Sequence, residues 1–181
     1  MPEMVEVVID SIRVGLMSQQ RVVILREIEA ERYLAIWIDA YMAEQITFAL
    51  QEVEVARPMT HDLIKNLLGS LEAKVLRVEV LSIKGDVFYG NIVVEVAGEI
   101  LNIDSRPSDA LALAVRTHVP ILVAGEVMET AGIIPEDDME GELEDGEGFG
   151  EDGGDNLEIF EDFLENLELS DDDGDAAEDE D

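Results

Sequence analysis

A strand pattern gives way to a helix pattern at Asp104-Ser105-Arg106-Pro107-Ser108-Asp109-Ala110-Leu111-Ala112-Leu113-Ala114. The Ala-Leu repetition, with no Gly or Pro before Pro120, predicts a helix of about ten residues. Pro107 suits the first turn of that helix, and a carboxylate at Asp109 is favoured there by the helix dipole. Strand-to-helix junctions often carry binding sites. The same residues also describe a capped helix whose entry is held by an ion pair, and both interpretations stay open.

Charge divides the chain into two parts. The 181 residues carry a net charge of −33, and all 11 basic residues precede position 135. Residues 1–134 sum to −9 and are rich in Val, Ile, Leu and Ala, whereas residues 135–181 sum to −24. The first part is long enough for one domain core. The second part, with self-repelling charge and little apolar surface, is predicted to be a mostly disordered acidic tail.

Other features of composition limit the function and the location. Without Cys, disulfides, thiolate metal sites and thiol catalysis are excluded. The acidic N-terminus does not resemble a signal peptide, and the apolar runs are too short for a membrane span. Capture of a small phosphate compound at the Arg106 helix entry is a further alternative, but no glycine-rich cradle supports it. No organic cofactor is predicted. We therefore expect a cytoplasmic protein that makes no membrane contact.

The pattern of the first 134 residues predicts an α+β domain. Alternating apolar residues and hairpin signals predict a mixed, largely antiparallel sheet, with about three to four helices. Asp39 is the expected N-cap of a helix that ends before Arg57-Pro58, and Thr60 is the expected N-cap of the next one. The apolar residues of that second helix are predicted to face inward: Leu63, Ile64, Leu67, Leu68 and Leu71.

Three separated motifs carry a family resemblance. They are Arg57-Pro58-Met59-Thr60-His61-Asp62-Leu63, Phe88-Tyr89, and Ser105 to Ala114. In order and spacing they resemble the bifunctional nuclease domain, over roughly residues 4–132. The resemblance implies a single α+β domain, self-association and the ability to degrade both DNA and RNA. It supplies no catalytic mechanism.

Phosphodiester hydrolysis needs a positioned water, stabilisation of charge on the phosphate and help for the leaving oxygen. Carboxylates that hold Mg²⁺ or Mn²⁺ can supply all three, and an arginine can bind phosphate in a bidentate manner. The predicted catalytic residues are His61, Asp62, Asp104 and Asp109, of which the three aspartates are also the predicted metal ligands. Arg57 and Arg106 are the predicted substrate-binding residues, and Glu44 is a further carboxylate on the preceding helix.

Each of these residues also has a structural interpretation. His61 and Asp62 suit the polar first turn of a helix, and the two arginines can pair with the aspartates to fix the two helix starts. A folded part with a net charge of −9 has no net attraction for nucleic acid, so we expect weak, salt-sensitive cleavage. The alternative is a non-catalytic regulatory protein whose oligomeric domain carries a partner-binding acidic tail.

One part of the tail has a helical pattern. Apolar residues at helical spacing predict a short amphipathic helix over residues 155–169. It can bind a partner protein by folding on contact, compete with nucleic acid for a basic patch on the same protein, or simply keep the chain soluble. Its apolar residues are Leu157, Ile159, Phe160, Phe163, Leu164 and Leu167.

Overall fold

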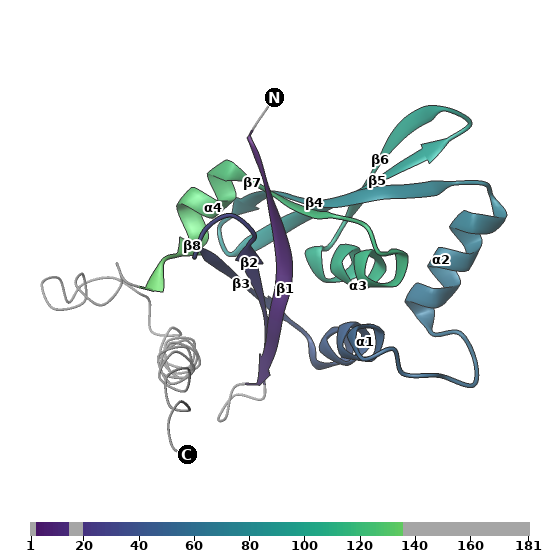
Figure 1. The fold of residues 1–181 in the computed structure, drawn as a ribbon, viewed down its shortest axis with the longest axis horizontal. Coiled ribbons are helices and arrows are strands. Elements are labelled where there is room, and N and C mark those ends of the chain that lie inside the picture. The colour runs from purple at the N-terminus through teal and green to yellow at the C-terminus, as the bar shows by residue number, and fades with distance from the viewer. Residues whose placement is uncertain (1–2, 15–19, 136–181) are drawn as a thin grey trace, which may run out of the picture.

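The computed structural model describes residues 3–14 and 20–135. Apart from Pro135, the predicted tail over 135–181 and its predicted helix over 155–169 lie outside these residues. The described residues form one eight-stranded sheet with four helices, which confirms the predicted α+β fold (Figure 1). The strands are β1 Met4–Val14, β2 Arg21–Glu27, β3 Tyr33–Ile38, β4 Lys74–Lys84, β5 Val87–Val96, β6 Glu99–Ser105, β7 Ile121–Ala124 and β8 Gly132–Ile133.

The sheet has the order β6-β5-β4-β7-β1-β2-β3-β8. Two antiparallel meanders, β1-β2-β3 and β4-β5-β6, lie on either side of the short strand β7. This strand pairs parallel with β4, in the register Val78↔Ile121, and antiparallel with β1. All other pairings are antiparallel, so the sheet is mixed and largely antiparallel, as the local hairpin signals predict.

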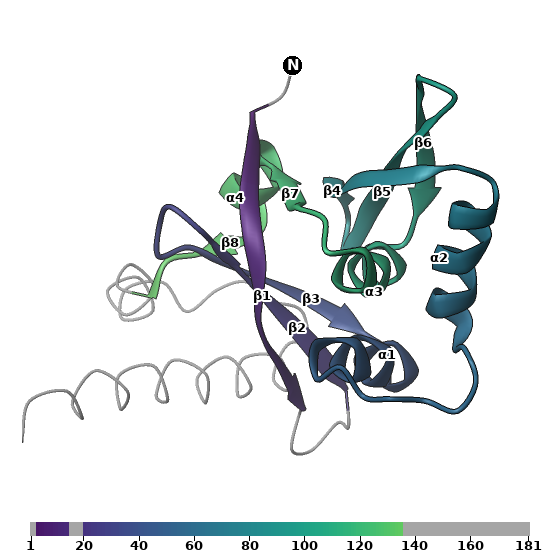
Figure 2. The same ribbon diagram turned by 45° about the vertical axis from the view of Figure 1, so that its right-hand side comes forward.

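The helices place α3 (Pro107–Thr117) at the centre of the fold. It contacts α1 (Ala40–Leu50), α2 (Thr60–Ser70), β4 and β5, and it lies between β4 and α1 in Figure 1. Figure 2 shows α2 standing across the end of this layer, while α4 (Gly125–Ala131) lies near β7 and β8. No helix among the described residues has the length and apolar character needed to cross a membrane.

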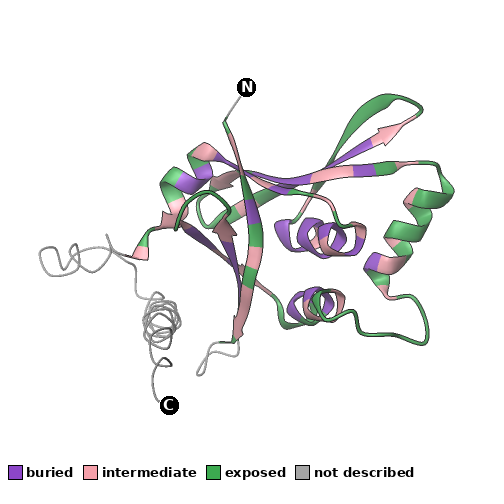
Figure 3. Cartoon of the chain, viewed as in Figure 1, coloured by how far each residue is buried: buried purple, intermediate pink, exposed green. Residues whose placement is uncertain are grey.

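Local sequence explains how α3 begins and ends. Arg106 is its N-cap, Pro107 opens the helix, and His118 closes it in the left-handed conformation with φ of 53°. The Ala-Leu run has small and large apolar residues on all sides, and most of α3 is buried (Figure 3). Such a helix is stable because neighbours cover it all round. The core around it includes Leu111, Leu113, Met42, Ile46, Val23, Leu25 and Val80.

The second predicted helix differs from expectation in two ways. Its N-cap is Met59 rather than Thr60, and Asp62 accepts a hydrogen bond from the Met59 backbone N–H at 2.9 Å. Only Ile64 and Leu68 pack against the core. The prediction that the whole leucine set faces inward is wrong, because α2 meets the fold along one narrow edge. The exposed fractions of Leu63, Leu67 and Leu71 are 61%, 55% and 62%.

A glycine allows α3 to start close to the sheet. A β-carbon on Gly90 of β5 would lie 3.0 Å from the backbone nitrogen of Pro107 and 3.0 Å from the carbonyl oxygen of Ser105. Gly90 and Ser105 are directly paired between β5 and β6. The backbone at the beginning of α3 therefore occupies the space that any larger residue at position 90 would need.

We expect Gly90→Ala to lower the free energy of unfolding by about 1–3 kcal/mol, because backbone rather than a flexible side chain must move. Gly69→Ala in α2 is the matched control, since a β-carbon there meets nothing within 4 Å. The control is expected to raise the free energy of unfolding by up to about 1 kcal/mol, because alanine favours the helical conformation more than glycine does. Urea unfolding of the full chain measures both. Equal changes in the free energy of unfolding for Gly90→Ala and Gly69→Ala would contradict the conclusion that the backbone at the start of α3 lies close to Gly90.

Candidate active site at the start of α3

Arg106 and Asp109 form a bidentate ion pair at the N-terminus of α3. The guanidinium Nε lies 2.7 Å from Asp109 Oδ2, and Nη2 lies 3.3 Å from Oδ1. The Arg106 side chain is 63% exposed and that of Asp109 is 31% exposed. The pair therefore fixes a guanidinium at the surface with N–H groups still available to a ligand.

His61 of α2 approaches the same carboxylate from inside the protein. Its Nε2 lies 3.1 Å from Asp109 Oδ1, and its side chain is only 3% exposed. Because a carboxylate accepts hydrogen bonds, the Nε2–H group of His61 donates to Asp109 Oδ1. Nδ1 is buried without a hydrogen-bond partner among the described residues. His61 therefore orients Asp109 from behind, and its second nitrogen does not face solvent.

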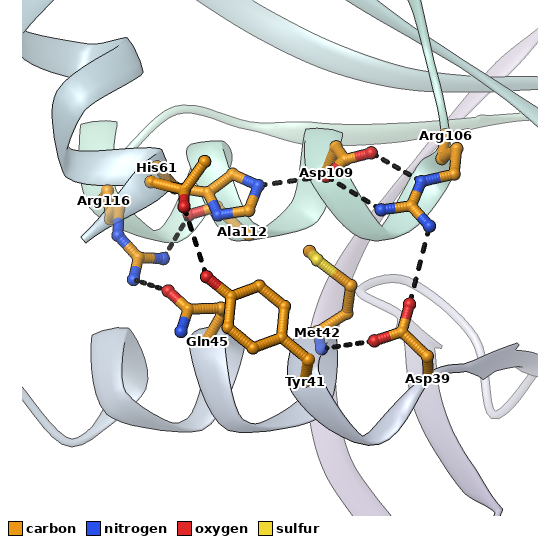
Figure 4. Close-up of polar contacts among 10 residues, drawn as sticks. Asp39, Tyr41, Met42, Gln45, His61, Arg106, Asp109, Ala112 and Arg116 are labelled. Carbon is orange, nitrogen blue, oxygen red and sulfur yellow. Dashed lines mark hydrogen bonds and ion pairs between the residues drawn. The ribbon is translucent and has the colours of Figure 1, made fainter.

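Asp39 extends this chain of contacts to α1. One carboxylate oxygen caps α1 by accepting from the Met42 N–H at 2.8 Å, and the other lies 3.5 Å from Nη1 of Arg106. Figure 4 shows Asp39 and Arg106 at the same end of two neighbouring helices. The N-termini of α1 and α3 are thus brought together, and both helix dipoles favour negative charge at this end. We call Asp39, His61, Arg106 and Asp109 the α3-entry cluster.

A second cluster, centred on Arg116, joins three helices and is largely buried. Arg116 Nε lies 2.7 Å from Asp62 Oδ1, and Nη1 donates to the Ala112 carbonyl oxygen at 2.9 Å. Nη2 lies 3.4 Å from Gln45 Oε1 on α1. The Arg116 side chain is 6% exposed. Figure 4 shows its contacts with Ala112 and Gln45. Asp62 is therefore engaged in holding α2 against α3.

The ion pairs shift the pKa values of the groups involved. Burial opposes ionisation of Asp109, but hydrogen bonds from Arg106 and His61 outweigh it and hold the Asp109 pKa below its ordinary value. Burial likewise opposes ionisation of Asp62, while the Met59 N–H and Arg116 lower its pKa overall. The hydrogen bond with Asp109 raises the pKa of Arg106. Both carboxylates and the guanidinium are therefore charged at neutral pH.

The structure brings together only part of the predicted site. His61, Arg106 and Asp109 are in contact, whereas Asp62 belongs to the Arg116 cluster. Asp104 is exposed on β6, where its neighbour Ile103 pairs with Ile92 of the helix-covered core. Since side chains alternate along a strand, Asp104 lies on the opposite face of the sheet from α3.

Two other candidate residues are exposed and separate from these contacts. Arg57, in the connection before α2, makes no ion pair or side-chain hydrogen bond within the described ranges. Glu44 is exposed on α1 and likewise has no such partner in that part of the chain. Arg57 is thus a free guanidinium at the surface, and Glu44 lies on the solvated side of its helix.

The carboxylates do not form a metal centre as they are arranged. Within residues 3–14 and 20–135, no three His, Asp or Glu side chains are grouped to hold an ion. Asp109 and Asp62 use both of their oxygens on arginine, histidine or backbone N–H groups. The predicted Mg²⁺ or Mn²⁺ site therefore stays a prediction, and we derive no chemical step through a metal.

Three contributors were not identified as site residues from the sequence. The sequence predicts Asp39 as a helix cap, but its contact with Arg106 spans 67 positions and leaves no local signal. For Gln45, likewise, no local feature of the sequence indicates the contact with Arg116. Arg116 had one, because it lies seven residues after Asp109 and so on the same face of a helix that is otherwise apolar.

Comparison with known proteins identifies the family of this chain. The sequence profile of the bifunctional nuclease domain matches residues 23–136. An uncharacterized protein of Mycobacterium tuberculosis is 34% identical over 92% of this chain and 96% of its own length. Bifunctional nucleases 1 and 2 of Arabidopsis thaliana are each 30% identical over 41% of this chain and 24% of their own length. Together with the motifs at His61 and Asp109, these matches show that the chain belongs to the bifunctional nuclease domain family.

Proposed function

We propose that this protein hydrolyses phosphodiester bonds in DNA and RNA, and that the α3-entry cluster contacts the scissile phosphate. One observation carries the proposal: Arg106 is 63% exposed, yet it is fixed in orientation by Asp109 and Asp39 at two helix N-termini. A preorganised guanidinium of this kind binds phosphate and stabilises the charge that develops on it. Membership of the bifunctional nuclease domain family supports the same activity.

The roles of the residues follow from their positions. Arg106 binds phosphate, Asp109 holds Arg106, and His61 orients Asp109 from the buried side. Arg57 is proposed as a second phosphate contact, because its guanidinium is exposed and unpaired within the described ranges. Asp62 acts as a positioning residue through Arg116. A requirement for Mg²⁺ or Mn²⁺ and a cytoplasmic location are further parts of this proposal.

Electrostatics limit how tightly the substrate binds. Residues 1–134 carry a net charge of −9, so affinity for nucleic acid depends on a few local cations rather than on the whole surface. The aspartates in the α3-entry cluster also compete with phosphate for Arg106. We therefore propose weak binding that falls as salt concentration rises.

The test is cleavage of fluorescent single-stranded DNA and RNA by the purified full chain, in Mg²⁺ or Mn²⁺ and with EDTA. We expect EDTA to abolish cleavage and Arg106→Ala to reduce it about a hundredfold. Asp104→Asn is the matched control: the sequence suggested it as a ligand, but it lies on the other face of the sheet. It is expected to cleave like the wild type.

Three outcomes would contradict this proposal. Equal activity of Arg106→Ala and wild type would remove the α3-entry cluster from the reaction. A loss in Asp104→Asn as large as that in Arg106→Ala would move the site to the other face of the sheet. Activity that disappears on repurification would belong to a contaminant.

The second candidate function is a non-catalytic, oligomeric interaction protein. It is favoured by the exposed stripe formed by Leu63 and Leu67 on α2 and by Leu71 at its C-cap, because contiguous exposed apolar surface marks interaction sites. It also fits an α3-entry cluster that serves only to fix two helix starts. Under this alternative the purified chain shows no cleavage with either metal, while light scattering gives a multiple of its 20.0 kDa mass.

A further inference from the structure

The sheet carries a second apolar cluster on the face opposite the main core. Along β2, Val23 and Leu25 belong to the main core, whereas Val22 and Ile24 point the other way. Val22 and Ile24 are each 1% exposed, and Tyr33 of β3 is 6% exposed. The cluster consists of Val22, Ile24 and Tyr33, with Ala35 and Trp37 packed against them. We call this surface the β2–β3 outer face.

None of the four described helices accounts for this burial. The residues that flank Ile24 across the strands are Ser11 on β1 and Ala35 on β3, and both are small. Side chains that stand side by side on one sheet face leave each other's tips open, so burying an isoleucine requires a layer above it. No residue of α1, α2, α3 or α4 belongs to the cluster. The helices among the described residues therefore do not supply that layer.

We propose that residues 155–169 of the acidic tail dock on the β2–β3 outer face as an amphipathic helix. Within this segment Leu157, Phe160, Leu164 and Leu167 recur at the spacing of one helix face. An isolated acidic helix of this length is marginal in water, so it gains its stability from the surface it covers. The inference does not depend on the nuclease proposal, because the two sites involve different residues.

The described chain ends beside this face. Strand β8 pairs with β3 in the register Tyr33↔Ile133, so residue 135 lies near the strand that carries Tyr33, Ala35 and Trp37. The stretch 136–154 then separates this point from the proposed helix. A flexible chain of that length spans about 24 Å between its ends, which is enough to return over two or three strands.

Charge favours the same occupant. Arg13 is in register with Val22, and Arg26 is in register with Tyr33, so the two arginines flank the apolar centre of the outer face. Arg26 is 41% exposed, with Asp10 at 3.7 Å. Residues 155–169 contain six acidic residues and no basic one. An acidic amphipathic helix therefore presents leucine and phenylalanine to the centre of this face and carboxylates to its rim.

Trp37 provides a direct reporter, because it is the sole tryptophan of the chain and lies on the outer face. The test compares acrylamide quenching of its fluorescence in two full-length double variants. Phe160→Ser with Leu164→Ser removes the two central residues of the apolar stripe of the proposed helix. Phe149→Ser with Leu143→Ser makes the same chemical changes earlier in the tail and serves as the matched control.

We expect the quenching constant to rise about twofold in the Phe160/Leu164 variant, with a red-shifted emission, because the indole loses its apolar cover. The control is expected to match the wild type. Circular dichroism checks that the β-sheet signal is retained in both. Quenching that does not change in the Phe160/Leu164 variant, or that rises equally in the control, would overturn the proposal. Quenching that increases on dilution of the wild type would overturn it in favour of cover by a second copy.

Discussion

Arg116→Ala is expected to lower the free energy of unfolding by about 3–5 kcal/mol. The guanidinium is 6% exposed and joins Asp62 of α2, Gln45 of α1 and the Ala112 carbonyl of α3. Its removal leaves the buried Gln45 Oε1 without its donor, and it leaves Asp62 with the Met59 N–H but without its ion pair. Arg57→Ala, an exposed arginine with no ion pair in the described ranges, is the control and is expected to change stability by less than about 0.5 kcal/mol.

The pH dependence of stability distinguishes the ion pair between Arg116 and Asp62 from simple packing of the Arg116 side chain. Because the Asp62 pKa is lowered in the folded protein, its stabilising contribution is complete above the unfolded-state value of about 3.9. It is lost as the pH falls through the lower, folded-state value. The stability gap between wild type and Arg116→Ala should therefore narrow on acidification below about pH 4. A gap that stays constant down to acid unfolding, or an Arg116→Ala effect no larger than that of Arg57→Ala, would contradict the ion-pair role.

Asp109→Asn is expected to lower the rate of nucleic-acid cleavage about a hundredfold while leaving the chain folded. The amide keeps the size of the carboxylate but removes the charge that holds Arg106 at 2.7 Å and accepts from His61 at 3.1 Å. Arg106 then loses its fixed orientation, so the guanidinium no longer meets the phosphate in one geometry. Initial rates on the same fluorescent substrates, with circular dichroism to confirm folding, measure the effect.

The double variant with His61→Gln shows whether His61 works through Asp109. If the two residues form one chain of contacts ending at Arg106, the double variant should lose about as much activity as Asp109→Asn alone. Losses that multiply would show that His61 acts independently of Asp109. Full activity of Asp109→Asn would remove this carboxylate from the reaction.

The strand and helix patterns predicted the fold class because each segment is locally consistent. The Ala-Leu run with Pro107 at its start predicted α3, and the alternating apolar residues with hairpin signals predicted a largely antiparallel sheet. The parallel pairing of β4 with β7 had no sequence signal, because it joins strands separated by two further strands and a helix. The orientation of Leu63, Leu67 and Leu71 was predicted wrongly, since periodicity defines an apolar face but does not say how much of it a neighbour covers.

The candidate site was predicted in part. His61, Arg106 and Asp109 were selected from two motifs, and the fold places them in contact. The grouping of Asp62, Asp104 and Asp109 as a metal site depended on distances that spacing does not give. Alternation along β6 turns Asp104 to the other face of the sheet, while Arg116 takes up Asp62. Asp39 enters the cluster only because α1 and α3 begin at the same end of the helical layer.

The sequence by itself determined the two-part charge, the secondary structure around each motif and the family, because composition, periodicity and motif order are properties of neighbouring residues. The tertiary structure decided which charges meet. Arg106 can pair with Asp39 only when two helix starts, 67 positions apart, are packed side by side. A long-range contact of this kind is set by the burial of the apolar faces of α1 and α3 against the sheet, a free energy that belongs to the whole core rather than to either motif.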